Sequence, residues 1–127
     1  MSYYFMKSLD TTFDEAITRA TDELQKEGFG ILTEIDVKAT MKKKLDVDFP
    51  QYKILGACNP PFAYKALQAE DKIGVMLPCN VIVQEKENGI EVSAVDPIAS
   101  MSAVDKPELA DVALEVQARL KKVIEAL

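Results

Sequence analysis

The sequence predicts an α+β domain in which helices pack on one face of a largely antiparallel β-sheet. Three observations lead to this fold class. Apolar residues recur every three or four positions in two long stretches near the chain ends, and every second position in several stretches between them. An Asn88-Gly89 pair also joins two of the alternating stretches, as in a β-hairpin. The 127 residues suit one domain, predicted over 1–127, and the crossovers leave the strand order open.

The first predicted elements are a short aromatic strand over residues 2–8 and a helix. Thr12 can accept from the backbone amide of Glu15 while Glu15 reaches back to the Thr12 amide, which is a capping box. Gly28 is expected to supply the left-handed residue that ends the helix. One buried stripe is expected on it, formed by Phe13, Ile17, Ala20 and Leu24.

A strand over residues 29–37 is predicted next, with Phe29, Ile31, Ile35 and Val37 on its inner face. Asp36 can then cap a short helix that ends before Pro50. That helix carries Val37, Met41 and Leu45 on one side. The following strand, residues 52–57, is expected to point Tyr52 and Ile54 inward.

A third helix and a hairpin are predicted after this strand. Asn59 suits an N-cap and Pro60 the first turn of a helix over residues 60–70 that buries Ala63, Ala66 and Leu67. Residues 74–97 are predicted to form the hairpin, with Asn88-Gly89 in a type I′ turn. Its inward residues are expected to be Val81, Val83, Ile90, Val92 and Ala94.

An irregular segment and a long C-terminal helix complete the prediction. Asp96 before Pro97 is expected to organise a turn, and residues 98–104 to be irregular. Asp105 and Glu108 repeat the capping pattern, with Pro107 in the first turn. This helix carries a continuous apolar stripe, which indicates packing against a sheet rather than formation of a coiled coil. The stripe consists of Leu109, Val112, Ala113, Val116, Leu120, Val123, Ile124 and Leu127.

Charge and hydropathy exclude several classes of protein. The net charge of −6 argues against nucleic-acid binding, which needs a concentrated basic surface. No stretch approaches the ~20 apolar residues of a membrane helix, and the first residues lack the pattern of a signal peptide. We therefore expect a cytoplasmic protein without membrane contact, whose two cysteines are thiols.

The absence of histidine restricts the chemistry further. Catalytic sites that pair serine or cysteine with histidine cannot be built from this chain, nor can mixed Cys and His zinc sites. The five glycines form no phosphate-binding pattern. We predict no cofactor and no catalytic residue, and we specify no metal ligand set.

Two Cys-Asn pairs are the strongest candidates for a site. Cys58 precedes the expected N-cap Asn59, and a helix N-terminus favours a thiolate. Cys79 and Asn80 begin a strand after Pro78. The alternative interpretation is structural, because a buried cysteine packs as a small hydrophobe and Pro and Asn suit turns. The candidate site comprises Cys58, Asn59, Pro60, Cys79, Asn80 and Asp96.

The stretches "YKILGACNPPFAYKAL", "GVMLPCNVIVQEKENG" and "VSAVDPIASM" resemble the bacterial and archaeal family of unknown function DUF302. The likeness covers nearly the whole chain. Its motifs match at residues 56–60, at residues 77–79, and at Asp96, Pro97 and Met101. The resemblance implies a compact α+β domain that associates as a homodimer, and it implies no activity.

Two functional hypotheses follow. The first is a non-catalytic homodimeric module that binds a small apolar ligand near the two Cys-Asn pairs. The second is a thiol-dependent protein, either redox-active or a carrier of a soft ion such as Cu(I), that uses Cys58 and Cys79. Both require the loop before the third helix and the start of the hairpin to converge.

Overall fold

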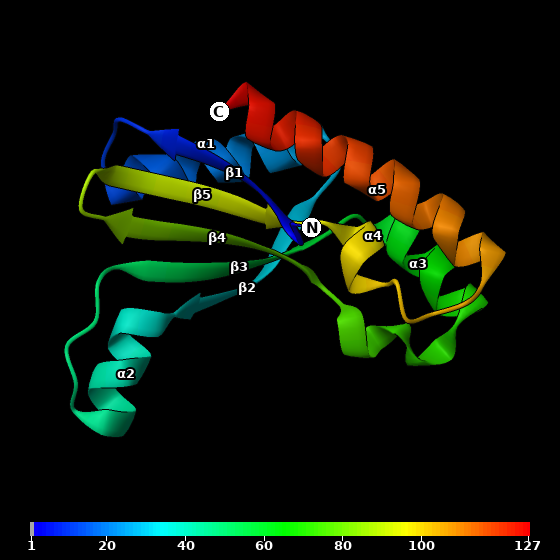
Figure 1. Ribbon diagram of the computed structural model, residues 1–127, viewed down its shortest axis with the longest axis horizontal. Coiled ribbons are helices and arrows are strands. Elements are labelled where there is room, and N and C mark those ends of the chain that lie inside the picture. The colour runs from blue at the N-terminus through cyan, green and yellow to red at the C-terminus, as the bar shows by residue number, and fades with distance from the viewer. Residues whose placement is uncertain (1) are drawn as a thin grey trace.

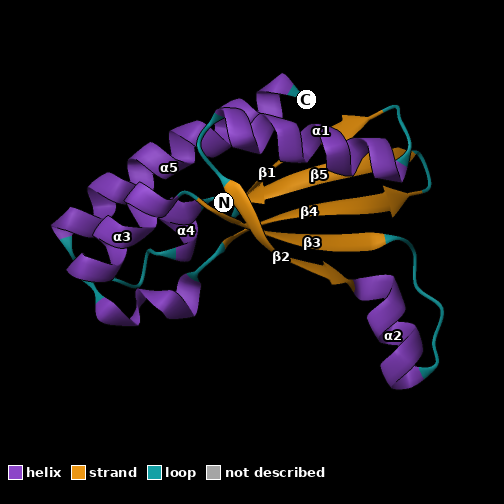
Figure 2. Cartoon of the chain, turned by 180° about the vertical axis from the view of Figure 1, so that it is seen from behind, coloured by secondary structure: helices purple, strands orange, loops and turns teal. Residues whose placement is uncertain are grey.

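The computed structural model describes residues 2–127 and contains one five-stranded sheet with helices α1 and α5 across one face (Figures 1 and 2). The strand order is β1-β5-β4-β3-β2, and every neighbouring pair is antiparallel, so the predicted fold class is confirmed. The elements, in chain order, are β1 Tyr4–Leu9, α1 Phe13–Lys26, β2 Gly30–Asp36, α2 Val37–Leu45, β3 Tyr52–Cys58, α3 Pro60–Ala69, the 3₁₀ helix η1 Asp71–Met76, β4 Cys79–Lys86, β5 Gly89–Val95, α4 Pro97–Ser100 and α5 Pro107–Ala126.

Helix α1 begins and ends at the predicted residues. Thr12 Oγ1 accepts a hydrogen bond from the Glu15 amide at 3.1 Å. The reciprocal bond predicted from the Thr12 amide to the Glu15 side chain is absent among residues 2–127, where the Glu15 carboxylate instead lies 3.5 Å from Arg19 Nε. After the C-cap, Gly28 has a φ of +87°, the left-handed conformation that glycine adopts without strain.

A β-bulge in β2 changes which residues face the helices. The register shifts between Ile31 and Thr33, so that Ile31 lies opposite the buried Ala57 while Ile35 lies opposite Ile54. Ile35 is therefore on the other face of the sheet and 48% exposed. Its predicted inward position is wrong, because one extra residue in a strand turns all later side chains over.

Strand β3 also presents the other set of side chains to the helices. Leu55 and Ala57 are fully buried, whereas Tyr52 and Ile54 are only partly buried. The predicted inward orientation of Tyr52 and Ile54 is therefore wrong. The sequence favours Tyr52 and Ile54, because the alternate set begins with the charged Lys53 and contains Leu55 as its one large apolar residue.

The hairpin of β4 and β5 supplies the centre of the core. Val81, Val83, Val92 and Ala94 are fully buried, as predicted. Its turn differs from the prediction. Lys86 pairs with Gly89, which leaves residues 87–88 as the loop, and of the described residues in this turn only Gly89 has a positive φ, so the turn is not type I′. The segment before β4, predicted as hairpin, contains η1 instead.

The C-terminal helix α5 buries six of its predicted stripe residues: Leu109, Ala113, Val116, Leu120, Val123 and Ile124. Its N-cap is Lys106, and the described residues give this position no side-chain cap, so the predicted Asp105–Glu108 capping is wrong. The segment predicted as irregular contains α4, capped by Asp96. None of the helices within residues 2–127 combines the length and apolar composition that crossing a bilayer requires.

Two apolar clusters lie under these helices. The larger cluster fills the space between the sheet and helices α1 and α5. The smaller cluster lies beyond the end of the sheet and consists of Ala66, Ile73, Met101, Leu109 and Ala113. Val112 of α5 packs against both clusters, so this helix joins them.

Candidate functional site

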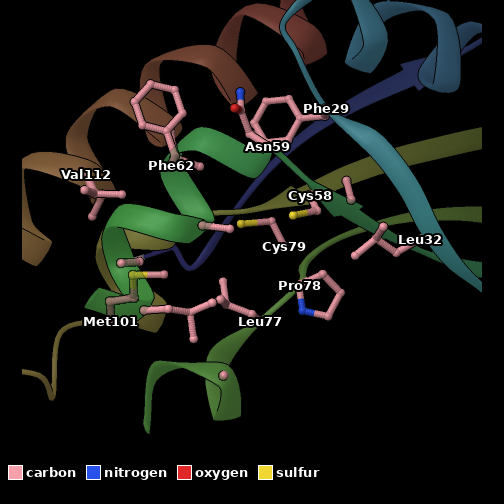
Figure 3. Close-up of a pocket in the computed structure, with 17 residues that line it drawn as sticks. Phe29, Leu32, Cys58, Asn59, Phe62, Leu77, Pro78, Cys79, Met101 and Val112 are labelled. Atoms are coloured by element: carbon pink, nitrogen blue, oxygen red, sulfur yellow. The ribbon is translucent and has the colours of Figure 1, made fainter. Parts of the chain in front are cut away.

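The structure brings the two cysteines together. Cys58 ends β3 and Cys79 begins β4, and these strands pair so that Ala57 lies opposite Cys79. The two side chains lie side by side in Figure 3, and both are free thiols. The expected convergence of the loop before α3 with the start of the hairpin is therefore confirmed.

Both thiols line a cavity of about 320 Å³ at the junction of the two apolar clusters, which we call the thiol cavity (Figure 3). Its walls come from the ends of β3 and β4, one side of α3, and the facing side of α5. The lining residues are Phe29, Leu32, Ala57, Cys58, Asn59, Phe62, Ala63, Ala66, Leu67, Gly74, Leu77, Pro78, Cys79, Met101, Val112, Ala113 and Val116.

The lining of the thiol cavity is almost wholly apolar. Among the described residues that form its walls, none carries a charge, and Asn59 has the one side chain with an amide or hydroxyl group. The volume falls near the lower end of the range of about 300–1,000 Å³ for small-molecule sites. Such a cavity accepts an apolar molecule and disfavours a charged one, because burying an unpaired charge is costly.

The two thiols have different environments. Cys79 is only 8% exposed, whereas Cys58 is half-buried. Burial raises the pKa of the Cys79 thiol to about 11, and the neighbouring Cys58 adds to the increase. Cys79 is therefore protonated at neutral pH.

Asn59 is buried and takes a different role from the one predicted. It occupies the N-cap position of α3, with Pro60 following, but its side chain makes no cap hydrogen bond within the part of the chain that the structure describes. Instead Asn59 Nδ2 donates to the backbone carbonyl of Glu27 at 3.1 Å. This bond turns the amide toward the end of α1, and Figure 3 shows it pointing away from the two thiols.

A second contact holds the same corner. Arg119 Nη1 donates to the Glu27 carbonyl at 3.3 Å, and the Arg119 guanidinium carbon lies 5.2 Å from the centre of the Phe62 ring. Arg119 Nε is buried without a hydrogen-bond partner among residues 2–127. Stacking on an aromatic ring offsets part of the cost of that burial.

Gly56 allows β2, β3 and the start of β4 to approach closely below the cavity. A Cβ at this position would overlap Thr33 Oγ1 and lie 2.8 Å from Pro78 Cγ. The Leu77–Pro78 peptide bond is cis. The pairing of β3 with β4, in which Ala57 lies opposite Cys79, places the two thiols at one end of the sheet.

Three of the predicted site residues lie outside the thiol cavity. Pro60 is exposed in the first turn of α3, and Asn80 is exposed on β4. Asp96 Oδ1 accepts from the Ile98 amide at 3.0 Å and from Gln117 Nε2 at 3.1 Å. Asp96 thus caps α4 and ties it to α5, as expected for a residue that organises a turn.

Several cavity residues were not among the predicted site residues. Phe62, Leu77 and Met101 line the cavity, and Arg119 supports its wall. The apolar residues carry no signal that separates a cavity wall from a filled core. Within residues 2–127, no group of three or more His, Cys, Asp or Glu side chains is placed to hold a metal ion.

Comparisons with known proteins agree on the fold. A family model described as "Domain of unknown function DUF302" matches residues 5–127. The crystal structure of an uncharacterized conserved DUF302 protein from Bacillus stearothermophilus is similar to this chain, with a TM-score of 0.91 and 25% sequence identity over 98% of each chain. No curated protein matches the chain.

Proposed function

Since the chain belongs to the family described as domain of unknown function DUF302, we propose its function from its geometry: it is a non-catalytic module that binds a small apolar molecule in the thiol cavity. One observation carries this proposal. The chain forms a pocket of about 320 Å³, open to solvent on one side, whose walls are apolar side chains and whose volume falls within the range of small-molecule sites.

Titration with 1-naphthol, a neutral aromatic probe, followed by amide NMR shifts, tests the proposal. Shifts are expected at residues of the cavity walls. Ala63→Leu fills the cavity and should weaken binding about tenfold or more, since a displaced ligand loses its apolar contacts. Gln68→Leu is the matched control, because Gln68 is exposed on the same helix and lies outside the lining. Equal binding to both variants, or shifts elsewhere, would contradict the proposal.

The module acts as a homodimer in this proposal, and the outer face of the sheet supports that. Helix α2 projects away from the body of the domain and buries none of its nine residues (Figure 1). A helix this short is marginal in water without packing. The sheet face opposite α1 and α5 also exposes large apolar side chains, with Met6 46% and Ile35 48% exposed.

Sedimentation velocity checks the dimer. Met6→Asp places a charge on the outer face and should shift the protein to monomers. Leu114→Asp is the control, because Leu114 is 55% exposed on α5, on the opposite side of the sheet. A wild-type protein that sediments as a monomer at every loading concentration would refute the dimer.

A second candidate function uses the thiols directly. Cys58 and Cys79 are free and lie together in one apolar cavity, a setting that suits two-coordinate binding of a soft ion such as Cu(I) or formation of a disulfide. Competition for Cu(I) with bicinchoninate tests the first role. Loss of two hydrogens from the intact mass after peroxide treatment tests the second. Unchanged behaviour in Cys58→Ser and Cys79→Ala would exclude both roles.

A further inference from the structure

The polarity and exposure of the thiol cavity define a ligand class: we propose that the cavity takes up the alkyl chain of a single-chain amphiphile, whose polar head group stays outside in water. This inference deepens the proposed function and rests on it, because the cavity must first admit an apolar group. It adds that the ligand is longer than the cavity and that its polar end is not recognised inside.

The cavity offers no side chain that could satisfy a polar group of a ligand. Among the described wall residues none is charged, and the Asn59 amide is turned to the Glu27 carbonyl, away from the thiols. The two thiols are only weak hydrogen-bond donors. A charged or strongly hydrated group drawn inside would lose its bonds to water without replacement, which is costly. The part of the ligand inside the cavity is therefore hydrocarbon.

The cavity has a closed end and an open end. Figure 3 shows Leu32 at one end of the lining and Met101 at the other, with the two thiols between them. Met101 is 7% exposed and belongs to the smaller apolar cluster, whereas Leu32 is 65% exposed. A chain that enters beside Leu32 therefore ends among buried side chains near Met101, and the atoms at its other end remain in solvent.

Exposed apolar side chains surround the open side of the cavity. Gly74 and Leu77 line the cavity, and between them in the chain Val75 is 81% and Met76 41% exposed. Leu67, itself a wall residue, is 43% exposed. We call Leu67, Val75 and Met76 the rim. A compact molecule held inside the cavity would leave the rim in water, whereas a chain that extends out of the cavity would cover it.

The source of the chain in this proposal is a free amphiphile and not a bilayer. Anionic membrane surfaces attract clusters of basic residues, and this chain has a net charge of −6. A head group that stays in water also needs no partner of a particular charge on the protein. Affinity should therefore depend on the length of the alkyl chain and only weakly on the head group.

Isothermal titration calorimetry with octyl maltoside, decyl maltoside, decyltrimethylammonium and decanoate, each below its critical micelle concentration, tests this dependence. Decyl maltoside should bind about tenfold more tightly than octyl maltoside, because two more methylenes are buried. The head group should change the Kd of the decyl compounds by less than about threefold at about 0.15 M salt, where exposed charges are screened. A larger dependence on head-group charge, or equal binding of the two maltosides, would overturn the inference.

Rim variants separate this inference from the proposed function. Val75→Asp and Met76→Asp should each weaken binding of decyl maltoside about fivefold or more, because a charge replaces an apolar contact. Binding of 1-naphthol should change by less than about twofold, since this compact probe stays within the walls. Leu114→Asp is the matched control and should affect neither probe, because Leu114 is exposed on α5 and lies outside the lining.

The outcomes distinguish the two proposals. If 1-naphthol binds in the cavity but decyl maltoside does not, or if the rim variants bind decyl maltoside as the wild type does, the amphiphile inference is overturned and the binding function stands. If neither probe binds in the cavity, both are overturned. Cosedimentation with phosphatidylcholine vesicles by a protein that binds no free decyl maltoside would assign the rim to a bilayer and also overturn the inference.

Discussion

Asn59 and the backbone carbonyl of Glu27 form a hydrogen bond of 3.1 Å across 32 residues of sequence. The bond joins the N-cap of α3 to the C-cap of α1. One buried amide therefore fixes the relative position of two helices and forms part of the thiol cavity wall.

Removal of this amide should destabilise the fold. We expect Asn59→Ala to lower the free energy of unfolding by about 1–2 kcal/mol, because the Glu27 carbonyl loses a buried donor while Arg119 still donates to it. Urea denaturation measures the change. Asn80→Ala is the control, since Asn80 is exposed and should change stability by less than about 0.5 kcal/mol. Similar losses in both variants would contradict a specific role for Asn59.

A methyl group at Gly56 should be poorly tolerated. Its Cβ would overlap Thr33 Oγ1 and crowd Pro78, so Gly56→Ala should cost about 1–3 kcal/mol through overpacking. Gly30→Ala is the matched strand variant, because a Cβ there meets nothing within 4 Å. Thermal unfolding compares the two. An equal or smaller loss for Gly56→Ala would show that β2 and Pro78 can move apart at little cost.

The buried thiol predicts a loss of stability in alkali. The pKa of Cys79 rises from its ordinary value of 9.0 to about 11 in the folded protein. Above pH 9 the unfolded chain gives up this proton before the folded chain does, so stability is fully present below pH 9 and is lost as the pH rises to about 11, by about 2–3 kcal/mol. Urea titrations at several pH values measure the decline. Cys79→Ala should show a shallower decline, and identical slopes would refute the burial effect.

The buried face of helix α5 should contribute far more to the stability of the fold than its exposed face. Leu120 is fully buried in the larger apolar cluster, so Leu120→Ala should cost about 2–5 kcal/mol. Leu114 lies on the same helix and is 55% exposed, and Leu114→Ala should change the free energy of unfolding by less than about 1 kcal/mol. Guanidinium unfolding of the two variants provides the comparison. Comparable losses would mean that the outer side of α5 is also covered.

The sequence predicted the parts of the fold that depend on local signals. Thr12 and Asp36 cap helices as expected, because an oxygen at the N-cap bonds the nearby backbone amide wherever the helix lies. The wrong assignments depend on non-local contacts. A bulge places Ile35 on the outer face of the sheet, and in β3 the inner face carries Leu55 where Ile54 was predicted. Both outcomes depend on the neighbouring strands and helices, because these decide which side of a strand is buried.

The candidate site was predicted in part for the same reason. Cys58 and Cys79 converge because two strands that flank a helix pair directly, an arrangement that the order of elements suggested. Phe62 could not be recognised, because an apolar residue at helical spacing looks the same beside a cavity as in a filled core. Asn59 was recognised by its N-cap position, but its bond to Glu27 needs the tertiary fold.

The division of the core into two clusters affects how the chain opens. The smaller cluster contains five buried residues and touches the larger one through Val112, with the thiol cavity between them. Local opening costs least where few apolar contacts must be broken. Backbone amides of α3, η1 and the first half of α5 should therefore exchange with deuterium earlier than those of β4 and β5. A molecule bound in the cavity would contact both clusters and reduce the difference in exchange rate. Amide exchange in α3, η1 and the first half of α5 would therefore report whether the cavity is occupied.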